Sequence, residues 1–241
     1  TYANGGLAVL DVSTIQDRKP NPRFAPVTSL DWTSGSIPQS ADPVTIDGHH
    51  YLLEVDEFAN YSLGSTADQS AAPVGAARPN LVTGAGYQPD APVGAARLIN
   101  VDDSRHPFVV SNLRLGVHQR AAREGAQGKD PGASSVVGGY ASHYCSAPRR
   151  VDPGIVACSM ILSGLRVLDV RDPYHPREVA YFNKPTQSGR LNVGAFAMSA
   201  PAYDGASGDV WYADGNIGLF AVHLVGPAAI PFAGRVLSPG S

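Results

Sequence analysis

Histidine and acidic side chains are the residues of this sequence best suited to hold a metal ion. Five of them are candidate ligands of one ion: His49, His50, Glu57, His118 and His143. Imidazole with carboxylate suits a transition metal. Calcium prefers oxygen ligands, and would implicate Asp56, Glu57 or Asp102. No H-x-H or H-E-x-x-H spacing occurs, so structural histidines at strand ends are the alternative.

The two cysteines, Cys145 and Cys158, flank a predicted hairpin turn at residues 151–154. If the turn is centred between positions 151 and 152, the cysteines face each other on neighbouring strands. Directly opposed residues have Cβ atoms about 4.5–5.5 Å apart, so a disulfide needs a close, non-hydrogen-bonded pair. We expect this bridge, and with it an oxidising compartment outside the cytoplasm. Two reduced, buried thiols are the alternative.

Other catalytic patterns are weak in this sequence. Gly84-Ala85-Gly86 and Gly138-Gly139 are short glycine groups without a strand-to-helix phosphate loop around them. No G-x-S-x-G nucleophile elbow occurs. Thr1 with its own amine is a known nucleophile arrangement, but a predicted strand is the wrong setting for it. Catalytic residues therefore stay unassigned.

Composition limits the classes of protein to which the chain can belong. Charged residues make up 16% of its 241 residues, and it contains 26 glycines and 20 prolines. With 43% hydrophobic residues, it is too apolar for a disordered chain and too broken for long helices. A net charge of −3 argues against nucleic-acid binding and a polybasic membrane anchor. No apolar run is long enough to form a transmembrane segment.

The elements that must position the candidate residues repeat along the chain. Each copy has a glycine, an alternating apolar strand and, in most copies, a turn containing Asp. The four copies span residues 6–13, 94–103, 164–173 and 218–223. A second element, Ser-Ala close to a proline, opens a strand before three of them, at Ser40, Ser146 and Ser199. Four antiparallel strands per repeat are the sequence form of a propeller blade.

We therefore expect an all-β β-propeller with about three and a half blades in this chain. The predicted parts are a partial blade (1–36), a blade (37–118), a loop insertion (119–139), a blade (140–190) and a last blade (191–241). Together they form the C-terminal part of one propeller domain. Each blade buries its faces against two neighbours, so half a propeller is not stable. The missing blades would come from the same polypeptide or from another chain.

Residues 165–170, Leu-Arg-Val-Leu-Asp-Val, with Asp172-Pro173 and Pro176 behind them, resemble the LVIVD repeat of bacterial and archaeal extracellular β-propellers. The other three copies match this repeat less closely, and residues 143–163 are similar to its long actinobacterial members. The resemblance implies a secreted or cell-surface protein and a ring of about seven or eight blades. It does not fix an activity, because propellers carry unrelated chemistries.

Two functions follow as hypotheses. The first is a binding or scaffold module that holds a protein or glycan ligand on its loops, near residues 65–92 or 119–139. The second is a metal-dependent oxidoreductase with copper or iron on histidines of the propeller channel. It rests on similarity to propellers of the methanethiol oxidase and selenium-binding group. Bound calcium that only rigidifies the fold is compatible with either function.

Overall fold

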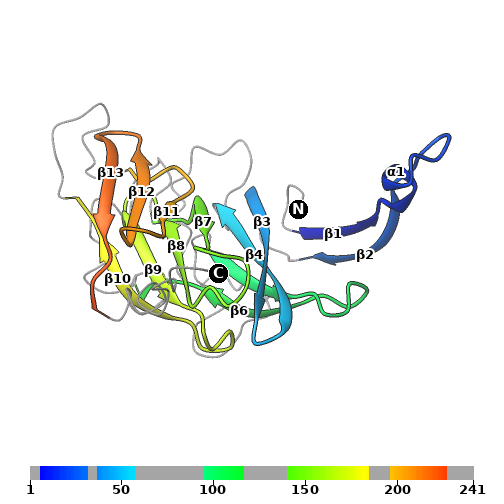
Figure 1. Cartoon of the computed structure of the whole chain (residues 1–241), viewed down its shortest axis with the longest axis horizontal. Coiled ribbons are helices and arrows are strands. Elements are labelled where there is room, and N and C mark those ends of the chain that lie inside the picture. The colour runs from blue at the N-terminus through cyan, green and yellow to red at the C-terminus, as the bar shows by residue number, and fades with distance from the viewer. Residues whose placement is uncertain (1–5, 32–36, 58–94, 117–139, 185–195, 227–241) are drawn as a thin grey trace, which may run out of the picture.

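Antiparallel strands make up nearly all the regular structure of the protein (Figure 1). The computed structural model describes residues 6–31, 37–57, 95–116, 140–184 and 196–226. Within these ranges it contains thirteen strands and one four-residue helix, α1 (Ser13–Gln16). Every pairing between these strands is antiparallel. The all-β class predicted from the sequence is confirmed.

The strands form four sheets that follow one another along the chain. The first sheet holds β1 (Gly6–Asp11) and β2 (Ala25–Asp31). The second holds β3 (Ile37–Ile46), β4 (His49–Glu57), β5 (Ala96–Asn100) and β6 (Phe108–Leu113). The third holds β7 (Tyr144–Ser146), β8 (Ile155–Ser159), β9 (Leu165–Asp169) and β10 (Arg177–Phe182). The fourth holds β11 (Ala202–Asp204), β12 (Asp209–Asp214) and β13 (Gly218–His223).

The predicted repeat of four antiparallel strands is present in the second and third sheets, where each strand pairs with the next along the chain. The four sheets fall inside the predicted units 1–36, 37–118, 140–190 and 191–241. In Figure 1 they run across the molecule in chain order, from β1 and β2 at the right to β13 at the left. Successive hairpins therefore build one sheet after another.

Hydrophobic side chains on both faces hold the third sheet between its neighbours. On β8, Val156 and Cys158 pack into a core shared with the second sheet, which contributes Leu53. Ile155 and Ala157 alternate with them and pack against the fourth sheet. Alternate residues of a strand point to opposite faces, so a strand buried on both faces must be apolar throughout. This explains the continuous Ile-Val-Ala-Cys run of β8.

The second sheet is likewise covered on both faces. Leu53 and Val55 of β4 face the third sheet, whereas Leu52 belongs to a core with Leu7 of β1 and Ile99 of β5. Each pair of consecutive sheets thus shares a hydrophobic core. The strand faces are used for contacts between sheets, which leaves the strand ends and the connecting turns at the surface.

Two ends of this stack carry the candidate residues. At one end, the turn after β3 meets the turn before β8, since Thr45 N–H donates to the Arg150 carbonyl at 2.7 Å. Asp47 N–H also donates to the Asp152 carboxylate there, at 2.9 Å. We call this the Asp47 end. The opposite end, where β4 finishes, is the Glu57 end.

Strand pairing corrects the repeat alignment by one residue. Matching Gly94 with Gly164 offsets the two repeats by 70 positions. In the structure Asn100 pairs with Phe108 in the second sheet, as Asp169 pairs with Arg177 in the third. Asn100 and Asp169 are therefore equivalent, an offset of 69. The glycine alignment is wrong because strand pairing, rather than the position of one glycine, sets the register.

Candidate functional site

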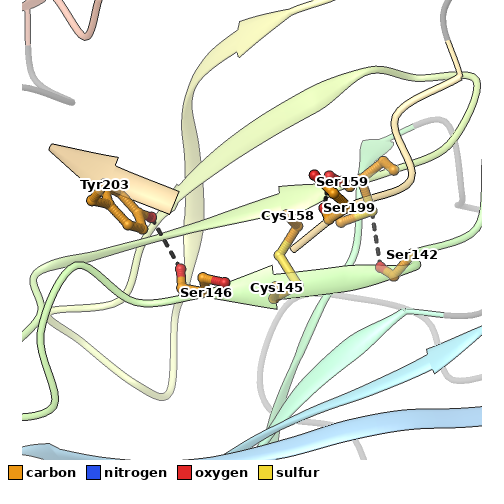
Figure 2. The surroundings of a disulfide bond; sticks show 8 residues. Ser142, Cys145, Ser146, Cys158, Ser159, Ser199 and Tyr203 are labelled. Atoms are coloured by element: carbon orange, nitrogen blue, oxygen red, sulfur yellow. Dashed lines mark hydrogen bonds between the residues drawn. A yellow bond between two sulfur atoms is a disulfide. The ribbon is translucent and has the colours of Figure 1, made fainter. Parts of the chain in front are cut away.

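The predicted disulfide joins Cys145 of β7 to Cys158 of β8 (Figure 2). The two residues are direct partners in the strand register, and their Cα atoms are 4.0 Å apart. In an antiparallel sheet, opposed residues that do not exchange backbone hydrogen bonds have the closer Cα atoms. This is the type of pair that a disulfide between directly opposed residues needs. Both cysteines are buried in the core between the second and third sheets. The predicted disulfide is thus confirmed, and it links the two strands of the hairpin on their buried face.

Polar contacts beside the disulfide connect the third sheet to the fourth. Tyr203 of β11 donates its hydroxyl hydrogen to the Ser146 carbonyl at 3.0 Å, as Figure 2 shows. The Ser159 hydroxyl donates to the Ser199 carbonyl at 2.6 Å. Both bonds start or end on the strands that carry the disulfide, so they tie β7 and β8 to the segment of the fourth sheet.

Strand β4 separates the four described members of the predicted ligand set into two groups. His49 and His50 begin the strand at the Asp47 end, and Glu57 finishes it at the other end. At roughly 3.3 Å per residue, the two ends lie about 26 Å apart, too far to contact one ion. His143 lies with Glu57, and His118 falls outside the described residues. The structure therefore does not bring these side chains together as one site.

A hydrogen-bonded row at the Glu57 end crosses three sheets. The Gln39 side chain donates to Glu57 Oε2 at 2.5 Å. His143 Nε2 lies 3.5 Å from the same oxygen. On the other side of its ring, His143 Nδ1 donates to the carbonyl of Met198, which precedes β11. The bond at Nδ1 leaves Nε2 of the neutral ring as an acceptor facing Glu57.

Burial changes the acidity of both groups in this row. Loss of solvent raises the pKa of Glu57 to about 7, although the bond from Gln39 acts in the opposite direction. Burial also lowers the pKa of His143, partly offset by its bond to the Met198 carbonyl. Near neutral pH, a protonated Glu57 and a neutral His143 are therefore accessible together. Such a pair can accept or release a proton within the physiological range.

The other histidines of the predicted set bind a carboxylate at the Asp47 end. His49 Nδ1 donates to one oxygen of Asp102 at 2.7 Å. The backbone N–H of His50 donates to the second oxygen, also at 2.7 Å. These bonds, the backbone bond foremost, lower the pKa of Asp102 to about 2. Asp102 is thus an ionised carboxylate that fixes the start of β4, as expected for structural histidines at a strand end.

Sequence reasoning missed a histidine motif at the same end. In the turn after β5, His106 Nδ1 donates to the Asp103 carboxylate at 2.7 Å. In the equivalent turn after β9, His175 binds Asp172 in the same way at 2.8 Å. Both turns read Asp-x-x-His-Pro. The correct 69-residue offset superimposes the two motifs, so the signal was present in the sequence and was obscured by the glycine alignment.

A shallow pocket of about 360 Å³ opens beside the turn after β9. Its lining residues are all charged or ionisable: Asp169, Arg171, Asp172, His175 and Arg177. Asp169 is nearly buried and accepts bonds from the Arg171 guanidinium, which lower its pKa. Arg177 lies 3.8 Å from the same carboxylate and is largely exposed. The pocket therefore offers a carboxylate acceptor and exposed cationic donors to a polar ligand.

The second sheet also buries an ionic cluster that the sequence did not reveal. Arg97 of β5 contacts the carboxylates of Glu54 and Asp56 on β4, and all three side chains are fully buried. Burial holds the pKa of Glu54 well above its usual range, although the Arg97 charge opposes this effect. Asp56, a calcium ligand expected from the sequence, is thus fully buried and paired with Arg97. Within the described residues, no group of three or more His, Cys, Asp or Glu side chains is arranged to hold a metal ion.

No protein-family model matches the chain, and no curated protein matches its sequence. Among the residues that the structure describes, no helix is long and apolar enough to cross a membrane.

Proposed function

We propose that the protein is an exported β-propeller of the LVIVD type that acts as a binding or scaffold module. The observation that carries the proposal is the sequence of sheets, each sharing a hydrophobic core with the next. Face-to-face packing of successive antiparallel four-stranded sheets is the construction of a propeller. In such a fold the turns at the two ends of the stack are free to bind ligands.

The buried disulfide supports export to the cell surface or the medium. Disulfides form and persist in oxidising compartments and are rare in the cytosol. The bridge between Cys145 and Cys158 lies in the core, where it joins two strands of one hairpin. A structural role of this kind requires that the bond persist for the lifetime of the protein. An extracytoplasmic location provides that condition.

The pocket beside the turn after β9 is a described surface that can take a polar ligand, and its chemistry favours a glycan. It is small, open and lined by charged side chains that donate and accept hydrogen bonds. Tyr174 belongs to the same turn and is half exposed, so it can offer an aromatic surface to a sugar ring. The loops at 65–92 and 119–139, proposed from the sequence as binding loops, lie outside the described residues.

A glycan array, followed by titration of the best ligand, tests this function. The variant His175→Ala with Arg177→Ala removes two pocket donors and leaves the Arg171 contact with Asp169 in place. We expect its Kd to rise roughly ten- to hundredfold, the effect of losing charge-assisted hydrogen bonds. His106→Ala is the matched control, because it changes the equivalent turn of the second sheet. No glycan binding, or equal loss in the control, would contradict the proposal.

A metal-dependent oxidoreductase is the second candidate, and one observation favours it. His143 Nε2 and Glu57 Oε2 lie 3.5 Å apart at the Glu57 end of the stack. Imidazole and carboxylate are suitable ligands for copper or iron. Elemental analysis of the dialysed protein separates the two functions. About one transition metal per molecule, lost in His143→Ala, would favour the oxidoreductase over the binding module.

A further inference from the structure

The turns after β5 and β9 share one hydrogen-bonded framework. In each turn the aspartate of the Asp-x-x-His-Pro motif accepts a backbone N–H from two residues ahead, Arg105 at 2.8 Å in one and Tyr174 at 2.9 Å in the other. The histidine of each motif binds the same aspartate. Such bonds from an aspartate to its own turn shape the backbone without a ligand. The shared residues therefore build both turns, and a function of one turn must come from the positions that differ.

Three positions at the pocket differ between the two turns. In the 69-residue offset, the residues of the third sheet and their counterparts in the second are Asp169 for Asn100, Arg171 for Asp102 and Arg177 for Phe108. The second sheet thus has one carboxylate and no cation at these positions, whereas the third has one carboxylate and two arginines. The pocket of the third sheet is therefore the cationic version of a common turn.

The carboxylates of the pocket already have donors within their own turn. Arg171 Nε donates to Asp169 Oδ1 at 3.0 Å, and the same guanidinium contacts the second oxygen of Asp169. The Asp169 side chain is only 7% exposed. Asp172 accepts from the His175 ring at 2.8 Å. A ligand that enters the pocket consequently meets carboxylates that are bonded to neighbouring donors.

Arg177 is placed differently from Arg171. It pairs with Asp169 across the strands at the start of β10, but its Nη2 lies 3.8 Å from the carboxylate, beyond hydrogen-bond distance. Its side chain is 75% exposed. A guanidinium carries its N–H donors in a planar fork that matches the paired oxygens of an oxyanion. Arg177 can therefore bind an anionic group of a ligand without first breaking a hydrogen bond to Asp169.

We propose that this pocket takes an acidic glycan, whose oxyanion binds Arg177 while a sugar ring lies against Tyr174. The proposal rests on the glycan-binding function proposed above, and it adds the charge of the ligand. The oxyanion is a uronate carboxylate or a sulfate ester, since both present paired oxygens to a guanidinium. Tyr174 is half exposed and belongs to the same turn. The equivalent turn of the second sheet, with Asp102 and Phe108 in place of the arginines, does not bind this ligand.

Binding of two acidic polysaccharides and their uncharged counterparts tests the ligand class. Polygalacturonate supplies carboxylates and dextran sulfate supplies sulfates; fully methyl-esterified polygalacturonate and dextran are the counterparts. Biolayer interferometry with the purified protein at about 0.15 M ionic strength gives each Kd. We expect at least one acidic polymer to bind about ten or more times tighter than its counterpart. Binding of polygalacturonate alone would identify the oxyanion as a carboxylate, and binding of dextran sulfate alone would identify it as a sulfate.

A matched pair of variants tests the role of Arg177. Arg177→Gln removes the charge from the pocket and should raise the Kd for the acidic polymer about tenfold. Arg105→Gln is the control, because it removes one exposed arginine from the equivalent turn of the second sheet. We expect the control to bind as the wild type does. Equal weakening by both variants would show general charge attraction and would overturn the proposal.

Two further results would also overturn it. One is equal affinity for an acidic polymer and its uncharged counterpart, and the other is no binding of either acidic polymer. The glycan array separates these failures from that of the glycan-binding function. A neutral glycan that binds at the pocket would preserve the function and remove the preference for acid, whereas an array without any ligand would contradict the function itself.

Discussion

The pKa values of Glu57 and His143 are shifted because folding places both side chains between the second and third sheets. Glu57 ends β4, and His143 precedes β7, so the pair forms only when the second and third sheets pack together. Burial raises the pKa of the acid to about 7 and lowers that of the base. Because of these pKa shifts, the free energy of unfolding depends on the protonation state of the groups at the Glu57 end.

Replacing Glu57 tests this connection through the pH dependence of stability. The native state binds more protons than the unfolded state between the ordinary pKa of 4.5 and about 7, so wild-type stability falls as pH rises through this range. Gln does not titrate, and His143 is common to both proteins. The free energy of unfolding of Glu57→Gln relative to wild type should therefore rise by about 2.5 kcal/mol from pH 5 to pH 8. Urea denaturation of both proteins at each pH measures this difference in the free energy of unfolding. A difference that does not change with pH would refute the burial of Glu57.

At the scale of the element, glycines in tight turns allow neighbouring strands to lie close together. Gly164, in the turn between β8 and β9, has a φ of +74°, and a Cβ added there would lie 2.3 Å from the Phe182 carbonyl oxygen. Gly48, in the turn between β3 and β4, has a similar φ of +77° but open space around it. The two glycines therefore share a left-handed backbone and differ in their surroundings.

This pair separates backbone strain from steric crowding. Gly48→Ala should lower the free energy of unfolding by about 1 kcal/mol, the usual cost of a left-handed conformation for alanine. Gly164→Ala carries the same cost and also forces β9 and the end of β10 apart. We expect a loss of roughly 3 kcal/mol or more for it. Equal losses in urea denaturation would show that the close approach at Phe182 does not matter.

The hairpin of β7 and β8 offers a second test at this scale. Its disulfide closes a loop with a sequence separation of 13. Cys145→Ala with Cys158→Ala should lower the free energy of unfolding by about 3 kcal/mol, mainly through the greater freedom of the unfolded chain. Thermal unfolding with and without a reductant is the measurement. The reductant should lower the Tm of the wild type and leave that of the variant unchanged; an equal response would argue against the bridge.

How much of this could be predicted from the sequence depends on the range of the interactions. The strands and the cysteine pair depend on local alternation and on the symmetry of one hairpin, both of which are visible in the sequence. The Arg97 cluster and the Glu57–His143 row depend on which strand lies beside which, and on bulges that shift the register. A slip of one residue moves a side chain to the other face, so these contacts could not be predicted.

At the scale of the whole molecule, the proposed propeller would place the four sheets as consecutive blades around one axis. The first strands of the second, third and fourth sheets, β3, β7 and β11, would then lie nearest that axis. The Gln39–Glu57–His143–Met198 row is compatible with this arrangement, because it connects the second, third and fourth sheets at the Glu57 end.

Electron cryomicroscopy of the protein purified from its own cells tests the proposed propeller most directly. We predict a closed ring of radial sheets, with β3, β7 and β11 lining the central channel. A sandwich, or an open row of sheets, would contradict the proposal.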